Sequence, residues 1–197
     1  MKIYFVADDL SGALDAAAAF HHAGRRVKVV LSVADWTAAD ENEVVGVTTE
    51  TRNALPPVAA AAVERALARG RAQGARLVYK KIDSTLRGPV AAELAALAAA
   101  MPEATILFAP ANPRAGRTVR DGVLLVRGVP VAETEFGRDP MSPVRESAIR
   151  RLLGTAATAR ISIASASKAR LENSGINGSP ESPKRRAWAN RSATWIK

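Results

Sequence analysis

An apolar, strand-like run followed by a polar cluster and then a helix-like stretch occurs twice in this chain. The first run is residues 3–7, and Asp8-Asp9-Leu10-Ser11-Gly12 follows it; the second is residues 77–82, and Asp83-Ser84-Thr85-Leu86-Arg87-Gly88 follows it. Repeated strand–loop–helix units are typical of a parallel sheet, whose carboxyl edge is where ligands bind. We therefore expect both clusters at one edge of one sheet.

More strand-like runs alternate with helix-like stretches along the 197 residues, a length that suffices for one domain with a core. We expect helices from about Gly12, over residues 56–73, from Pro89 to about residue 100, and over about residues 144–153. The alternation predicts an α/β fold with a doubly wound, mostly parallel sheet. Its five expected strands are residues 3–7, 27–31, 44–48, 76–82 and 105–109.

Two details refine this expectation. Residues 123–126 and 129–132 are apolar and flank Arg127-Gly128, which is typical of a β-hairpin inserted after the fifth strand and a loop over residues 110–120. In the first helix, helical spacing places one set of residues on a common face. This set is Leu10, Leu14, Ala17, Ala18 and His21.

The formal net charge of +9 is unevenly distributed. Residues 1–159 contain 20 Lys and Arg against 17 Asp and Glu, whereas residues 160–197 contain 8 against 2. The last segment is also polar and aperiodic, so we expect a folded domain over residues 1–159 and a basic, disordered tail over residues 160–197. Only residues 184–188 in this tail combine clustered cations with an aromatic residue, which disfavours nucleic-acid binding.

Composition excludes several kinds of site. The chain has no cysteine and its two histidines are adjacent, so we assign neither a disulfide nor a metal site. No GxGxxG or GxxxxGK[ST] motif is present, and hence no recognisable nucleotide-phosphate loop. Residues 1–10 lack the pattern of a signal peptide and no apolar run is long enough to span a bilayer; we expect a cytoplasmic protein without a membrane partner.

The first polar cluster has two interpretations. Asp at a helix start is often a cap, so either Asp8 or Asp9 could cap the first helix while the other is solvated. Alternatively, the pair supplies a general base or a metal-phosphate anchor at the end of a strand. The residue pair alone does not decide between these two roles.

The second cluster suits a small, hydroxylated, anionic ligand. Lys81 and Arg87 can bind a carboxylate, while Asp83 and Ser84 can bind hydroxyl groups. The alternative is a solvated charged loop with an Asp–Arg pair, which contributes little. A third cluster of basic residues and Gly, over residues 112–118, either holds an anion or is a mobile surface loop.

Four stretches of the sequence together resemble the amino-terminal domain of the four-carbon acid sugar kinases. They are residues 6–13, 80–88, 115–118 and 122–143, and the resemblance covers about residues 1–153. It implies a two-domain enzyme that uses ATP, with Mg²⁺ on the phosphates, to phosphorylate threonate, erythronate or a 3-oxo-tetronate. In such an enzyme the amino-terminal domain binds the sugar acid and a separate domain binds ATP.

The resemblance also implies roles for individual residues. Asp9, together with Asp8, would orient or deprotonate the attacking hydroxyl as the catalytic group. The substrate-binding residues would be Ser11, Lys81, Asp83, Ser84, Arg87 and Arg117. Ser11 stands where the family usually has Thr, and Pro89 stands where Asn is common.

The resemblance ends before any ATP-binding domain. We expect a premature, frame-shifted end of the chain, which would leave it without bound ATP or Mg²⁺ and without kinase turnover of its own. The expected partners are a small sugar acid and either a second copy of the chain or a separate ATP domain. A sugar-acid sensor without catalysis is the alternative function.

Overall fold

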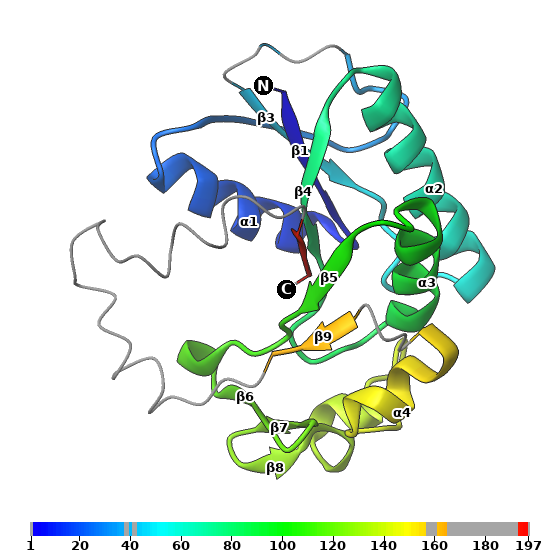
Figure 1. Cartoon of the computed structure of the whole chain (residues 1–197). Coiled ribbons are helices and arrows are strands. Elements are labelled where there is room, and N and C mark those ends of the chain that lie inside the picture. Colours follow the sequence, from blue (N-terminus) through cyan, green and yellow to red (C-terminus); the bar gives the residue numbers. More distant parts are fainter. Residues whose placement is uncertain (1, 38–39, 41–42, 157–160, 165–192, 197) are drawn as a thin grey trace.

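A computed structural model of the chain describes residues 2–37, 40, 43–156, 161–164 and 193–196. Within this part, seven strands form one sheet in the order β2-β3-β1-β4-β10-β5-β9, and every neighbouring pair is parallel (Figure 1). The strands are β1 (Ile3–Ala7), β2 (Arg26–Val30), β3 (Glu43–Thr48), β4 (Arg76–Lys81), β5 (Thr105–Phe108), β9 (Ile161–Ile163) and β10 (Ala193–Ile196). The predicted parallel sheet is thus confirmed.

Helices cover both faces of the sheet, as the predicted doubly wound fold requires (Figure 1). Alternation along β1 explains why, since Phe5 and Ala7 pack with α1 residues whereas Tyr4 and Val6 pack with α2 and α3 residues. The helices are α1 (Leu10–His22) on one face, α2 (Pro56–Ala72) and α3 (Val90–Ala100) on the other, and the short α4 (Ile149–Leu153).

The face that α1 buries differs from the leucine-containing one that its sequence suggests. Its buried residues are Gly12, Ala13 and Ala16, while Leu10 and Leu14 are 37% and 54% exposed. Small residues let the helix backbone lie close to the sheet. The close approach therefore selects the small-residue face.

The predicted hairpin is present, within a second, three-stranded antiparallel sheet of β6 (Arg117–Arg120), β7 (Val123–Val126) and β8 (Val129–Pro130). Arg127 and Gly128 both have positive φ, as does the pair Asp121-Gly122 between β6 and β7. Two consecutive positive φ values are the requirement of the tight hairpin turn that matches strand twist. The turn at Asp121-Gly122 pairs residues 117–120 with β7 as a strand, where we expected a loop.

Two expectations of extent need correction. The last helix begins at Ile149 and not near Val144: residues 143–147 are not helical, and Ser147 O accepts from Leu124 N of β7. β8 ends at Pro130, and a 3-10 turn replaces its expected last residues. The short 3-10 helices are η1 (Pro113–Ala115), η2 (Val131–Glu133), η3 (Glu135–Arg138) and η4 (Gly154–Ala156).

The expected tail contributes two strands, β9 and β10, to the main sheet. The predicted disorder of residues 165–192 lies outside the described residues. None of the helices that the structure describes is long and apolar enough to cross a membrane.

Candidate active site

The sheet order brings three polar loops together. β1 lies between β3 and β4, so the loops that follow these three strands meet at one carboxyl edge. The loop after β3 is tied to the loop after β1 by the backbone, because Thr51 N and Arg52 N both donate to Asp8 O, at 2.9 and 3.2 Å. The loop after β4 packs against the loop after β3 at Gly88, where a Cβ would lie only 2.6 Å from Arg52 O.

Arg52 links both aspartates of the first motif. Its Nε and Nη2 donate to the two oxygens of Asp8 at 2.9 and 3.1 Å. Its Nη1 and Nη2 donate to the two oxygens of Asp9 at 2.5 and 2.8 Å. One guanidinium therefore fixes two adjacent carboxylates in a planar fork.

The two aspartates differ in environment. Asp8 is 2% exposed, and this burial raises its pKa, which the charges of Lys80 and Arg52 offset only in part. Asp9 is the N-cap of α1, since its Oδ1 accepts from Gly12 N at 2.8 Å, and 18% of its side chain remains exposed. Asp9 is therefore the member of the pair that a ligand can reach.

Arg87 is held between two carboxylates and an aromatic ring. Its Nε donates to Asp83 at 2.6 Å, its Nη1 donates to Asp139 at 3.1 Å, and its guanidinium lies 5.4 Å from the centre of the Phe136 ring. Burial raises the pKa of Asp83, but hydrogen bonds from Arg87 and Thr85 outweigh it and lower the pKa overall. Two of the five N–H donors of Arg87 are used in these bonds.

These groups surround a small concavity, which we call the carboxylate hollow. Its volume is about 390 Å³. It combines four carboxylates with two guanidinium groups, and hydroxyl-rich anions fit such a mixture of acceptors and cations. The lining residues are Asp8, Asp9, Glu50, Arg52, Asn53, Arg87, Asp139, Pro140 and Met141.

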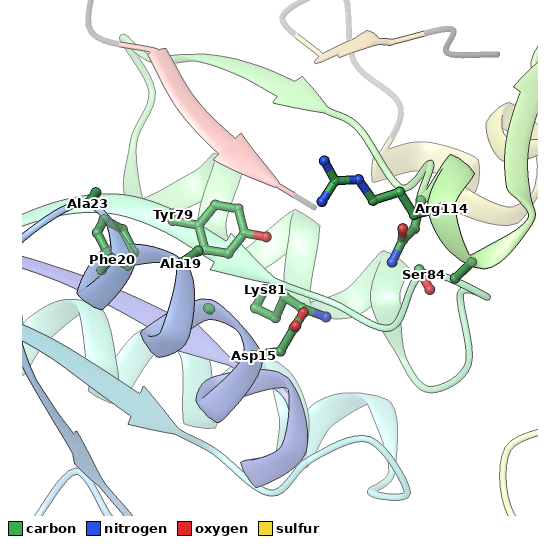
Figure 2. Close-up of a pocket in the computed structure, with 11 residues that line it drawn as sticks. Asp15, Ala19, Phe20, Ala23, Tyr79, Lys81, Ser84 and Arg114 are labelled. Carbon is green, nitrogen blue, oxygen red and sulfur yellow. The ribbon is translucent and has the colours of Figure 1, made fainter. Parts of the chain in front are cut away.

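A larger groove of about 790 Å³ lies between α1 and β4 (Figure 2). Figure 2 shows Phe20 and Ala23 at its apolar end, and Lys81, Ser84 and Arg114 toward its polar end. Gly12 lies close to a lining residue of each cavity: a Cβ there would lie 2.6 Å from Asp9 Oδ1 of the carboxylate hollow and 3.5 Å from Lys81 Nζ of this groove. We call this feature the α1–β4 groove.

The structure thus divides the residues expected at the site. Asp8, Asp9 and Arg87 line the carboxylate hollow, whereas Lys81 and Ser84 line the α1–β4 groove. The other three, Asp83, Ser11 and Arg117, line neither, and Asp83 accepts from Arg87 Nε at 2.6 Å. Ser11 is exposed on the first turn of α1, and Arg117 donates to Ala115 O at 2.7 Å and stacks 5.6 Å from the centre of the Phe136 ring.

Sequence reasoning missed four polar residues of the carboxylate hollow. Glu50, Arg52 and Asn53 follow an apolar strand, as the two recognised clusters do, so the same rule would have found them. Asp139 lies in a stretch quoted for the resemblance, but nothing local shows that it reaches Arg87, 52 residues earlier in the chain. Among the described residues, no group of three or more His, Cys, Asp or Glu side chains forms a metal cluster.

Comparisons with known proteins identify the family of this chain. A family model described as the sugar-binding N-terminal domain matches residues 3–188. The D-threonate kinase of Bordetella bronchiseptica is 45% identical over 159 residues, which are 78% of this chain and 39% of that enzyme. The 3-oxo-tetronate kinase of Methylobacterium radiotolerans is 36% identical over 76% of this chain and 36% of its own length.

Solved structures show the same fold. A DUF1537 domain from Bordetella bronchiseptica, a domain-swapped dimer with bound citrate, superposes on 100% of this chain and 53% of its own, with a TM-score of 0.82 and 35% identity. A protein from Salmonella typhimurium LT2, described as a putative tRNA synthase, has a TM-score of 0.74 at 25% identity and is covered over 48% of its length.

The fold and the family match together define a sugar-binding α/β domain of a kinase family. This chain belongs to the family of sugar-binding N-terminal domains of the four-carbon acid sugar kinases. It spans less than half the length of these two curated kinases and about half the length of the solved structures.

Proposed function

We propose that this chain binds a four-carbon sugar acid in the carboxylate hollow and presents it for phosphorylation by ATP held on a separate domain. The observation that carries the proposal is the meeting of Asp9, Arg52 and Arg87, from three separate loops, at the carboxyl edge of the sheet. The kinase names of the relatives support the reaction class. Citrate, also a hydroxylated carboxylic acid, is bound in one solved relative.

Charge and size support this class of ligand. A four-carbon hydroxy acid needs a cation for its carboxylate and several acceptors for its hydroxyl protons. Arg87 keeps N–H donors beyond its bonds to Asp83 and Asp139. Lys81 Nζ, which donates to Ile82 O at 3.0 Å in the neighbouring α1–β4 groove, would lie 3.5 Å from a Cβ on Gly12, and Asp9 Oδ1 of the hollow would lie 2.6 Å from the same Cβ. We infer that these two cations bind the substrate carboxylate.

The remaining groups then have distinct roles in the proposal. Asp9, the more exposed aspartate, accepts the hydrogen bond of the attacking hydroxyl and orients or deprotonates it, because a base must lie within hydrogen-bond reach of its proton. Both oxygens of Asp8 accept hydrogen bonds from Arg52, so Asp8 orients that side chain. Asp83, whose oxygen accepts from both Thr85 and Arg87, orients Arg87, while Ser84 faces the α1–β4 groove.

ATP and Mg²⁺ belong to the proposed reaction as phosphoryl donor and counter-ion. The sequence has no phosphate-binding loop of the recognised kinds, so these residues do not fit a triphosphate site of their own. We therefore assign only positioning of the acceptor to this chain. Such positioning is a major part of catalysis of phosphoryl transfer.

Calorimetry on the full chain tests the proposal. D-threonate and D-erythronate are compared with butyrate, which lacks the hydroxyl groups, and with threitol, which lacks the carboxylate. The proposal expects binding of at least one sugar acid, at least about tenfold tighter than either control, because each lost charged hydrogen bond costs about 1.5–3 kcal/mol. Equal affinity for butyrate would show an unspecific anion site, and no binding at all would overturn the proposal.

A further inference from the structure

Two adjacent lysines on β4 point to opposite faces of the sheet. Lys81 lines the α1–β4 groove, whereas Lys80 is 2% exposed and pairs in register with Val6, which packs on the side of α2 and α3. Alternation along a strand accounts for the two directions. Only Lys81 is accounted for by the proposed sugar-acid site.

Lys80 forms a fully buried ion pair. Its Nζ donates to Glu93 Oε2 at 2.9 Å and to Lys81 O at 3.1 Å, and both charged side chains are 2% exposed. Glu93 lies in the first turn of α3, whose other buried residues are apolar. Because well-packed apolar residues at such positions are often at least as stable, the pair is poorly explained by stability alone.

A chain of hydrogen bonds leads from this pair to the proposed site. The second oxygen of Glu93 accepts from Thr51 Oγ1 at 2.7 Å, and Thr51 is 3% exposed. Thr51 N in turn donates to Asp8 O at 2.9 Å, and the next residue is Arg52. The pair therefore anchors the segment that places Arg52 against Asp8.

Lys80 and Glu93 act on Asp8 in opposite directions. The charged groups around Asp8 are Lys80 from β4, Glu93 from α3, Glu50 and Arg52 from the loop after β3, and its neighbour Asp9, while Asp83 from the loop after β4 acts on Arg52. Burial is the largest influence on the pKa of Asp8 and raises it, Lys80 is the next and lowers it, and Glu93 has the smaller, opposite effect.

We propose that Lys80 and Glu93 are positioning residues, whose buried ion pair anchors the Thr51–Arg52 segment, places two opposite charges near Asp8 and so sets the shape of the carboxylate hollow. The pair touches no ligand in this arrangement. The use of the hollow for a sugar acid rests on the proposed function. The coupling between the pair and Asp8 does not, and it is measured without any ligand.

The experiment is a titration of the Asp8 carboxyl carbon by nuclear magnetic resonance in the full chain, with the signal assigned from Asp8→Asn. Lys80→Met should move the Asp8 midpoint up by about 0.5–1 pH unit, because an attractive charge is lost. Glu93→Gln should move it down by a similar amount, because a repulsive charge is lost while the amide can still hydrogen-bond to Thr51. The matched control is Lys28→Met, whose partner Glu43 lies in a more exposed pair; it should leave the midpoint unchanged.

Opposite shifts separate charge coupling from loosened packing, which would move both midpoints the same way. Equal shifts, or none in folded variants, would overturn the proposal. Should either single variant fail to fold, Lys80→Met/Glu93→Gln decides, since it leaves neither member of the pair as an unpaired charge. There the Asp8 midpoint should still rise, because the Lys80 charge acts more strongly on Asp8 than the Glu93 charge does; an unchanged or lower midpoint would contradict the inference.

Discussion

Arg52 and Asp8 are 44 residues apart in the sequence and form a two-pronged ion pair, with Nε and Nη2 of Arg52 donating to the two Asp8 oxygens at 2.9 and 3.1 Å. The side chains are 17% and 3% exposed, so water screens the pair weakly. The same guanidinium binds Asp9. The geometry of the hollow therefore depends on one arginine.

Replacing this arginine should destabilise the fold. Arg52→Met leaves Asp8 buried without its main partner, and removing one member of a buried pair costs about 3–5 kcal/mol. Urea unfolding should show a lower midpoint with an unchanged slope. Arg26→Met is the control, because the Arg26–Asp40 pair is 66% and 74% exposed and should matter little. A midpoint loss no greater than that of the control would show that Asp8 is satisfied without Arg52.

The free energy of unfolding should fall as the pH is lowered, because Asp83 becomes protonated. Its pKa is lowered in the folded chain, so its contribution is fully present above its ordinary unfolded pKa, about 3.9, and is lost as pH falls through the lower folded value. Asp83→Asn should therefore cost most stability near pH 6 and progressively less toward pH 3. Chemical unfolding at several pH values measures this. Asp35→Asn, at an exposed position, is the control; a cost for Asp83→Asn that does not change with pH would contradict the prediction.

Adding one methyl group at Gly12 should destabilise the fold, which is the opposite of the usual effect of this substitution within a helix. Gly→Ala within a helix usually stabilises by about 0.5–1 kcal/mol. Here the Cβ would lie 2.6 Å from Asp9 Oδ1 and 3.2 Å from Lys81 Cγ, so the cap or the lysine must shift. Gly12→Ala should lower the free energy of unfolding. Ser11→Ala, on the exposed side of the same turn, should change this free energy by less than about 0.5 kcal/mol. A stabilised Gly12→Ala variant would show that α1 can move away from β4 freely.

The same glycine shows what sequence could and could not foresee. The strand–loop–helix order, an aspartate cap on the first helix and the Gly128 turn follow from local signals; the structure confirms them and identifies Asp9 as the cap. Hydrophobic spacing pointed to the face with Leu10 and Leu14, yet the sheet receives Gly12 and Ala16. Spacing measures which side chains are apolar, whereas the close approach of two backbones depends on tertiary packing.

Local sequence patterns could not predict the long-range ion pairs either, because these pairs also depend on tertiary packing. Asp139 follows a 3-10 helix, Glu135–Arg138, and reaches Arg87 because Phe136 of that helix packs against the Arg87 guanidinium. Burial of Lys80 was equally invisible, since its partner Glu93 reads as an ordinary first-turn acid of α3. Pairings of this kind are decided by topology, which places residues that no sequence window contains.

Binding of the sugar acid should depend on the fork of Arg87 and not on its charge alone. Arg87→Lys keeps the charge but loses the paired donors, so affinity for D-threonate should fall by about tenfold or more. Arg26→Lys is the matched control at the opposite edge of the sheet and should bind as the parent does. Calorimetry decides: unchanged affinity in Arg87→Lys would remove Arg87 from contact with the carboxylate.

Catalysis should depend on the Asp9 carboxylate beyond its structural role as a cap. The test enzyme joins this chain to the ATP-binding part of the Bordetella bronchiseptica D-threonate kinase. Asn is also a good N-cap and can accept from Gly12 N as Asp9 does. Asp9→Asn should therefore leave the free energy of unfolding within about 1 kcal/mol of the parent. It cannot take a proton, so kcat should fall by about 10²–10⁴-fold while KM changes far less. Ser11→Ala, two residues further on and outside the hollow, should keep kcat. A near-normal kcat in Asp9→Asn would leave Asp9 as a cap and a ligand of Arg52 only, and Asp8→Asn would then be the variant to assay.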